Sequence, residues 1–313
     1  MKPLPRCQLA MLLVAVTCVV ARTVGAQQVP DTSFVPVVGA PTFAPGAGPL
    51  VRIDEGHWNF HTMGGRFMPF ARLLEHDGWR VEPHRGRFTR ESLAGARVLV
   101  ISNALADTGD WVLPARPAFT HDEVIAVRDW VRGGGALLLI ADHMPFPGMN
   151  AELARALGIE FIDGFALDDS GRAGIAKFRR GHGLEDHAIT NGRGAEDHID
   201  SIATFTGQGF RLRAKGAPIL RLDRRFTILM PDTAWAFGPK TRRMSGDGLL
   251  QGAALEVGRG RVAVFGEAAM FSAQLGGPNR LPMGFNHPIA PQNARFVLNV
   301  LRWLGAAPGP TGG

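Results

Sequence analysis

The sequence predicts an α/β fold, a doubly wound and mostly parallel sheet with an irregular, partly antiparallel C-terminal half. In the first half of the chain, apolar runs typical of buried strands alternate with amphipathic helical patterns. The connections between them are short, which favours parallel strands with helices on both faces. In the second half the apolar runs are shorter and less regular, which favours partly antiparallel pairing.

Each element of the first half has its own local pattern. The candidate strands are 50–54 "LVRID", 79–83 "WRVEP", 97–102 "RVLVIS" and 136–141 "ALLLIA", and the candidate helices are 66–79, 120–135 and 150–158. Apolar residues recur at helical spacing in the first helix until Gly78 stops it. The second helix opens with a capping box, Thr120 to Glu123, and ends in glycines.

The second half contains shorter candidate strands and a closing helix. The strands are 199–205 "IDSIATF", 210–214 "FRLRA", 218–222 "PILRL", 226–230 "FTILM" and 260–267 "GRVAVFGE". The helix, 293–304 "NARFVLNVLRWL", carries apolar residues on one face. It is expected to pack on the sheet and complete the domain.

Residues 1–26 have the pattern of a signal peptide. Lys2 and Arg6 precede the apolar run 9–21, and small residues end at Ala26. A membrane anchor is the alternative, but a spanning helix needs about 20 apolar residues, and Arg22 interrupts this run. We therefore expect cleavage after Ala26, export to the periplasm or outside the cell, and no stable membrane anchor after cleavage.

Removal of this leader changes the chemistry of the mature chain. Cys7 and Cys18 lie in the leader, so the mature chain would have no disulfide, thiolate nucleophile or cysteine ligand. Three of the 34 basic residues leave with it, and the remaining 31 against 28 acidic residues give a net charge of +3. That charge is too small to predict a nucleic-acid partner.

The remainder of the chain divides by composition. Residues 27–49 are rich in Pro and Gly and predict an extended lead-in. Residues 50–305 suit a single domain with a substantial core. Residues 306–313, "AAPGPTGG", predict a disordered tail. The oligomeric state is not predicted.

Ionisable and polar side chains follow several of the predicted strands. The candidate catalytic residues are Asp54, His57, Asp142, His143 and Glu267, and the candidate ligand-binding residues are Glu55, Asn59, His61, Ser102, Asn103 and His287. All but His287 follow an apolar strand. Because the carboxyl ends of parallel strands meet at one edge of a sheet, these groups predict a polar pocket for a small molecule there.

Several of these residues have a structural alternative. Asp54 can cap the turn that follows it, and Glu267 can cap "AAMFS". His57 and His61 have the spacing of metal ligands on one helical face. The glycines at 56, 64 and 65 favour a loop instead, so a divalent metal is only one of the alternatives and the cofactor is unknown.

The sequence resembles the class I glutamine amidotransferase-like (GATase-like) superfamily over about 50–304. The resemblance rests on the motifs "DEGHWNFH", "WVRGGGALLLIADH", "DHAITNG", "GRVAVFGEAAMFS" and "NARFVLNVLRWL". The likeness is greatest to uncharacterised exported members and to the GATase-like domains of gliding-motility and intraflagellar-transport proteins. It implies a flavodoxin-like fold.

The chain departs from that family where the chemistry matters. Amidotransferases have a nucleophilic cysteine after the strand that 136–141 resembles, where this chain has Asp142 and His143. Their His-Pro-Glu motif resembles 287–289, which ends in Ile289. Glutamine hydrolysis through a thioester is therefore excluded.

Two functions remain open. The first is a cysteine-independent hydrolase or lyase in which Asp, Glu and His act as acid, base or metal ligands. Similarity to trehalose-utilisation-like relatives keeps a sugar-related substrate open by analogy. The second is a non-catalytic domain that keeps the site for a ligand or partner.

Overall fold

A computed structural model describes residues 28–169 and 174–306. The predicted signal peptide 1–26 and nearly all of the predicted tail 306–313 lie outside these residues. Within the described ranges, no helix is long and apolar enough to span a bilayer.

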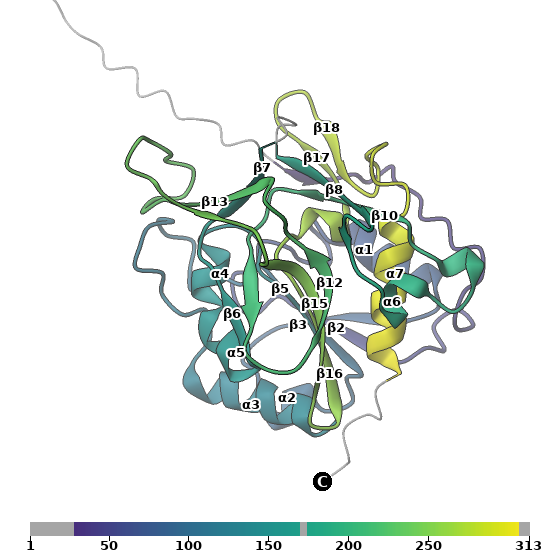
Figure 1. The fold of residues 1–313 in the computed structure, drawn as a ribbon. Coiled ribbons are helices and arrows are strands. Elements are labelled where there is room, and N and C mark those ends of the chain that lie inside the picture. Colours follow the sequence, from purple (N-terminus) through teal and green to yellow (C-terminus); the bar gives the residue numbers. More distant parts are fainter. Residues whose placement is uncertain (1–27, 170–173, 307–313) are drawn as a thin grey trace, which may run out of the picture.

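A large mixed sheet forms the centre of the molecule (Figure 1). From one edge to the other its strands are β10 (Ser201–Phe205), β8 (Ile175–Arg180), β9 (Gly183–Leu184), β12 (Ala217–Arg221), β15 (Leu250–Val257), β16 (Gly260–Phe265), β5 (Ala136–Ile140), β4 (Val98–Ser102), β2 (Leu50–Asp54) and β3 (Arg80–His84). Two short strands, β6 (Ile159–Phe161) and β11 (Phe210–Leu212), pair with each other, and β11 also pairs with β15.

One half of this sheet is parallel. The parallel pairs are β3 with β2, β2 with β4, β4 with β5, and β5 with β16. Beyond β16 the pairing is antiparallel, first with β15 and then between β15 and β12. β2 lies between β3 and β4, so the order of the strands reverses between β2 and β4. In open sheets of parallel strands, ligands bind beyond the carboxyl ends at such a point.

The predicted α/β class with an antiparallel C-terminal part is confirmed, but a flavodoxin-like, doubly wound fold is not established. The sheet has mixed strand orientation, and few helices cover it. The physical reason lies in the connections. β15 and β16 are joined by the two residues 258–259, which suffice for an antiparallel pair, whereas a parallel pair needs a long crossover.

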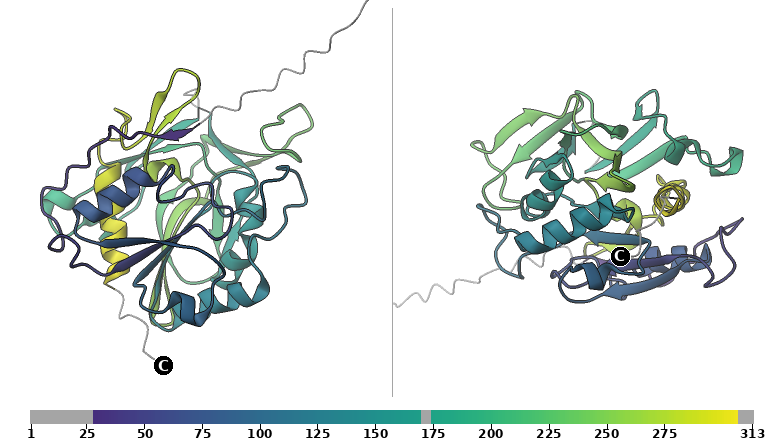
Figure 2. Two further views of the ribbon diagram at one scale, coloured as in Figure 1. Left: turned by 180° about the vertical axis from the view of Figure 1, so that it is seen from behind. Right: turned by 90° about the horizontal axis from the view of Figure 1, so that it is seen from below.

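Helices cover both faces of the parallel half. α1 (Met68–His76) and α7 (Asn293–Gly305) lie side by side on one face (Figure 2). On the other face α3 (His121–Arg132) packs against α2 (Arg90–Leu93) and α5 (Ala151–Ala156). The remaining helical segments are α4 (Phe146–Met149), α6 (Ala188–Asn191) and the 3-10 turns η1 (Ala195–Asp197) and η2 (Ala269–Phe271).

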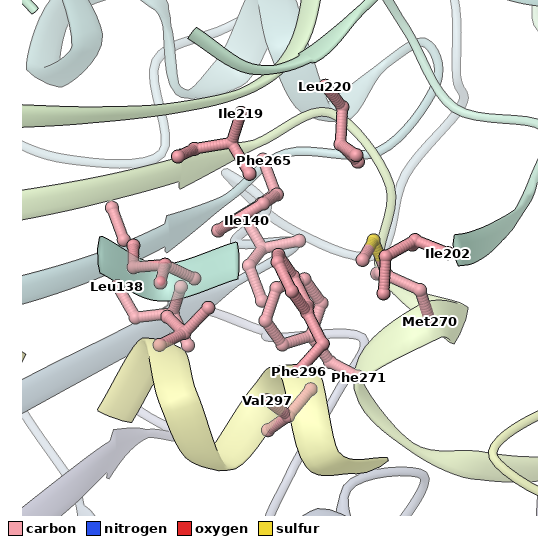
Figure 3. Close-up of a cluster of buried hydrophobic side chains, with 14 of the residues drawn as sticks. Leu138, Ile140, Ile202, Ile219, Leu220, Phe265, Met270, Phe271, Phe296 and Val297 are labelled. Atoms are coloured by element: carbon pink, nitrogen blue, oxygen red, sulfur yellow. The ribbon is translucent and has the colours of Figure 1, made fainter. Parts of the chain in front are cut away.

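Strand β5 shows how the sequence creates two cores. Leu138 and Ile140 pack with residues of α7 such as Phe296 (Figure 3). Leu137 and Leu139 point to the opposite face and pack with α3. Because side chains alternate along a strand, an uninterrupted apolar run has to be buried on both faces. Each such leucine contributes on the order of 1.5–3 kcal/mol by leaving water.

Helix α3 begins and ends where the sequence predicts. The Thr120 hydroxyl accepts the Glu123 N–H, and the Glu123 carboxylate accepts the Thr120 N–H, which completes the predicted capping box. At the other end, a Cβ on Gly135 would lie 2.4 Å from the Trp130 ring. Glycine therefore lets the chain turn closely beneath that indole and enter β5.

Two small antiparallel sheets flank the central one. One contains β14 (Arg242–Ser245), β13 (Phe226–Met230) and β7 (Phe165–Asp168), and the other contains β1 (Val29–Pro30), β17 (Ala273–Gly276) and β18 (Leu281–Gly284). The predicted strand 226–230 is therefore confirmed, but it belongs to a separate small sheet. The 273–284 hairpin was missed because its sequence lacks a continuous apolar run.

Candidate functional site

The candidate residues after β2, β4, β5 and β16 lie at one edge of the sheet. Phe265 of β16 is opposite Ile140 of β5, and Ile140 is opposite Ser102 of β4. Asp142 and Glu267 each follow two residues beyond this aligned row. We refer to this end of the parallel strands as the carboxyl edge. The edge coincides with the reversal of strand order between β2 and β4.

His57 lies between two carboxylates at this edge. Its Nδ1 is 2.9 Å from Asp54 Oδ1, and its Nε2 is 2.9 Å from Glu123 Oε1. Asp54 also accepts hydrogen bonds from Asn59 Nδ2 at 2.9 Å and from the Gly56 N–H at 3.1 Å. All three members of the Asp54–His57–Glu123 group are buried. The predicted turn cap at Asp54 is therefore present, together with an ionic contact.

The surroundings of His57 favour its charged form. Burial alone would lower the pKa of His57, but hydrogen bonds and negative charge from Asp54 and Glu123 outweigh it and raise the pKa. Phe88 and Phe119 pack on the imidazole, with ring centroids 4.5 and 4.8 Å away. With both ring nitrogens occupied, His57 ties the end of β2 to the start of α3.

His61 and Ser102 form a second buried group. His61 Nδ1 is 3.3 Å from Ser102 Oγ, and its Nε2 is 3.4 Å from Gln274 Nε2. Complete burial holds the pKa of His61 well below its usual value. His61 is therefore a neutral imidazole that contacts polar but uncharged side chains.

Asp142 and Glu267 follow adjacent parallel strands. The Asp142 N–H donates to Asn103 Oδ1 at 2.8 Å, and Asp142 Oδ1 accepts the His143 N–H at 2.7 Å. Glu267 accepts the N–H groups of Ala269 and Met270 at 2.7 and 2.8 Å. It therefore caps η2, which was the structural alternative predicted for this residue. Glu267 is fully buried, and Asp142 is 8% exposed.

Burial raises the pKa values of both Asp142 and Glu267. It raises the pKa of Glu267 to about 8, with the negative charge of Asp142 acting in the same direction. Burial also raises the pKa of Asp142, although its hydrogen bonds and His143 oppose the change. Two nearby carboxylates in a poorly solvated site cannot both ionise easily. Burial and the negative charge of Asp142 therefore favour the protonated form of Glu267 near neutral pH.

His143 is half-buried among aromatic rings that no local pattern predicted. Its Nδ1 is bonded to Met144 O at 2.8 Å. Phe165 stacks on the imidazole, with centroids 4.8 Å apart and an 11° angle, and Trp235 meets it edge-on at 4.7 Å. These rings come from β7 and from the loop after β13, so only tertiary structure brings them to His143.

Backbone strain concentrates at the same edge. Asn103, Thr206 and Trp235 have φ angles of 50°, 85° and 67°, a region that non-glycine residues rarely adopt. Asn103 bonds the Asp142 N–H. Thr206 precedes Gly207, where an added Cβ would lie 3.0 Å from Glu267 Cβ. Strained residues of this kind cluster at functional sites.

Two candidate ligand-binding residues contact other parts of the molecule. Glu55 accepts the Met63 N–H at 2.9 Å and pairs with the exposed Arg85 at 3.2 Å. His287 caps the turn at Ile289 and packs on Phe205 at 5.5 Å. Their contacts therefore fix loops, and their predicted role in ligand binding stays a prediction.

A groove of about 1340 Å³ lies away from these residues. It lies at the opposite end of the strands, where α2 and α3 approach the starts of β2 and β4, and its lining includes Arg80, Asp122 and Trp130. Its charged side chains are mostly exposed and of both signs. Buried carboxyl groups with raised pKa values are the stronger sign of chemistry, so we assign the candidate site to the carboxyl edge.

The residue types needed for a metal site are not assembled in the described ranges. Within 28–169 and 174–306, no three His, Cys, Asp or Glu side chains are grouped so that they could hold a metal ion. The histidine spacing that suggested helical metal ligands lies in a loop, where His57 and His61 take different partners.

The chain is similar in fold to solved proteins, although no protein-family model and no curated protein matches it. The mmIFT52 N-terminal domain superposes with a TM-score of 0.57 at 13% identity, over 82% of this chain and 98% of that one. A protein described as ThuA-like from Bacteroides uniformis gives a TM-score of 0.47 at 11% identity, over 86% and 94%. The cytoplasmic protein STM3548 from Salmonella typhimurium gives 0.49 at 15% identity, over 82% and 98%.

These identities establish a likeness of fold alone. Of these three proteins, the mmIFT52 domain has a TM-score above 0.5, and the fold comparison rests on it. It agrees, at the level of the fold, with the resemblance to intraflagellar-transport domains that the sequence motifs indicated.

Proposed function

We propose that the protein is an exported, GATase-like hydrolase or lyase in which Asp142 and Glu267 work as a proton-sharing acid–base pair on a small, sugar-related substrate. The placement of this buried pair directly after adjacent parallel strands, at the carboxyl edge, carries the proposal, and the raised pKa values support it. The motif resemblance and the fold likeness support the GATase-like part. The leader pattern in residues 1–26 supports export.

The geometry gives each group a role in hydrolysis. Asp142 is the partly exposed member of the pair and would take a proton from the attacking water. The resulting hydroxide adds to the substrate, and a protonated His143 would give its Nε2 proton to the leaving group as the bond to that group breaks. The proton held by Asp142 then returns to His143. Burial raises the pKa of Asp142 and so favours its role as the base, and Glu267 stays buried behind it as the second carboxyl group. No cysteine is required for these steps.

A non-catalytic binding domain is the second candidate. Glu267 is engaged by two backbone N–H groups of η2, and His57 is enclosed by two carboxylates. Both arrangements can serve stability alone. In that case the edge would bind a ligand without changing it.

The test compares Asp142→Asn with the mature wild-type chain. Both would be assayed against chromogenic glycosides, esters and lactones, with Asp129→Asn on exposed α3 as the matched control. We expect at least one substrate to be turned over, and a loss of about 10²–10⁴ in rate on removing the base. The Glu267→Gln variant should shift the pH profile of the rate. Equal rates for Asp142→Asn and wild type would refute acid–base catalysis by this pair.

A further inference from the structure

Exposed apolar side chains gather beside His143. Four of the large hydrophobic residues that are exposed, Val112, Leu113, Trp235 and Phe237, belong to the two loops 105–117 and 231–241. Trp235 is 53% exposed and Phe237 is 41% exposed. Single exposed apolar residues are ordinary, but a local group of them marks a binding surface.

The two loops hold each other in place. Leu113 N–H donates to Asp232 O at 2.9 Å, and Ala234 N–H donates to Trp111 O at 2.9 Å. Val112 and Thr233 form a β-bridge between the loops. Trp235 adopts its left-handed φ within this paired backbone. The aromatic surface is therefore pre-formed, which lowers the entropic cost of binding.

Polar groups lie next to that surface. Trp235 contacts the His143 ring at 4.7 Å, and His143 follows Asp142, whose carboxylate accepts its N–H. His143 Nδ1 is bonded to Met144 O, and no hydrogen bond within the described ranges uses Nε2. A half-exposed indole, an imidazole nitrogen and a carboxylate thus belong to neighbouring residues.

We propose that Trp235 forms a stacking platform for a pyranose ring, with Phe237 standing at a steep angle beside it and His143 Nε2 and Asp142 bonding the hydroxyls of the sugar. The proposal rests on the function proposed above, because it supplies the substrate class for the same site. One face of a pyranose presents polarised C–H groups that suit the negative face of an indole. Its rim carries hydroxyls that both donate and accept.

The arrangement of the rings argues against an organic cation as the ligand. Aromatic cages for cations direct several ring faces at one point. Here the face of Phe165 is stacked on His143. Phe237 meets Trp235 at 78°, with centroids 6.2 Å apart. More than half of Trp235 remains open, which provides a single platform.

Calorimetric titration of the mature chain tests this proposal. The probes are methyl glucopyranosides and galactopyranosides of both anomers, with choline chloride as the cation. We expect at least one pyranoside to bind and to change tryptophan fluorescence. Trp235→Ala should weaken that binding about tenfold, and Trp235→Phe should weaken it less. Trp303→Phe, on the distant α7, should bind like wild type.

The outcomes separate this inference from the proposed function. Binding that depends on Trp235 without turnover supports the platform and counts against catalysis. Turnover that is insensitive to Trp235→Ala and Trp235→Phe supports catalysis and overturns the platform. Binding of choline in preference to every pyranoside, or no pyranoside binding at all, also overturns it. Circular dichroism of each variant verifies that it is folded.

Discussion

At the scale of single residues, the protein buries carboxyl groups at an energetic cost. Asp163 is an example outside the candidate site, in the connection between β6 and β7. Both of its side-chain oxygens are buried, and neither has a hydrogen-bond partner within the described ranges, so the neighbouring Gly148 backbone N–H offsets the burial only in part. A Cβ on Gly148 would lie 2.3 Å from Asp163 Oδ2, so glycine permits this close approach. Burial raises the pKa of Asp163 to about 6.

We predict that Asp163→Asn stabilises the protein above pH 6. Because the folded pKa is raised from 3.8, the stabilisation linked to protonated Asp163 is complete below pH 3.8 and is lost as the pH rises through about 6. The charged form then costs on the order of 3 kcal/mol, which asparagine avoids. Urea unfolding at pH 4 and pH 7.5 measures this difference. Asp129→Asn is the exposed control, and an equal effect at both pH values would contradict the prediction.

At the scale of elements, the Asp54–His57–Glu123 group joins the end of β2 to the start of α3. Sequence reasoning assigned Glu123 to the capping box and His57 to catalysis. The structure gives Glu123 both roles, because one carboxylate oxygen accepts Thr120 groups and the other contacts His57. The contact spans 66 residues of sequence. It fixes the loop 55–61, which supplies Asn59 and His61 to the carboxyl edge.

Replacing His57 with Ala should destabilise the fold by about 3–5 kcal/mol at pH 6, since it leaves two buried carboxylates without their partner. The folded pKa of His57 is raised, so its contribution is complete below its ordinary 6.5 and is lost as the pH rises through the folded value. The pKa of Glu123 is lowered, because its hydrogen bonds outweigh burial. Its contribution is therefore complete above 4.5 and is lost as the pH falls.

Chemical unfolding across this pH range measures the effect. The loss in free energy of unfolding caused by His57→Ala should be largest between about pH 4.5 and 6.5 and smaller at pH 9. His198→Ala is the control, because the side chain of that half-buried histidine lies 3.6 Å from the exposed Asp200 and is not enclosed between two buried carboxylates. A loss of stability that does not change with pH would contradict this prediction. It would show that His57 stabilises the fold by packing between Phe88 and Phe119 and not by its charge.

At the scale of the whole molecule, stability comes from two apolar layers on either side of the parallel strands. The layer under α1 and α7 and the layer under α3 are built by alternate residues of the same strands. Both cysteines lie in the predicted leader. Without that leader, folding of the chain involves no disulfide.

We predict that the mature chain begins at Gln27 and has a thermal midpoint that is indifferent to reducing agent. Intact-mass measurement after expression in an exporting host checks the cleavage after Ala26. Thermal unfolding with and without thiol checks the second part. A full-length chain retained in the membrane, or a midpoint that falls with thiol, would disagree with the predicted leader.

The sequence by itself determined the strands of the parallel half, the helices that cover them and the edge that collects the polar residues. These follow from periodicity, capping and glycine stops, which act over a few residues. Tertiary structure alone decided that His57 is enclosed between Asp54 and Glu123, and that His143 lies against Phe165 and Trp235. The physical reason is that these contacts join distant segments, whose register depends on the packing of the whole sheet.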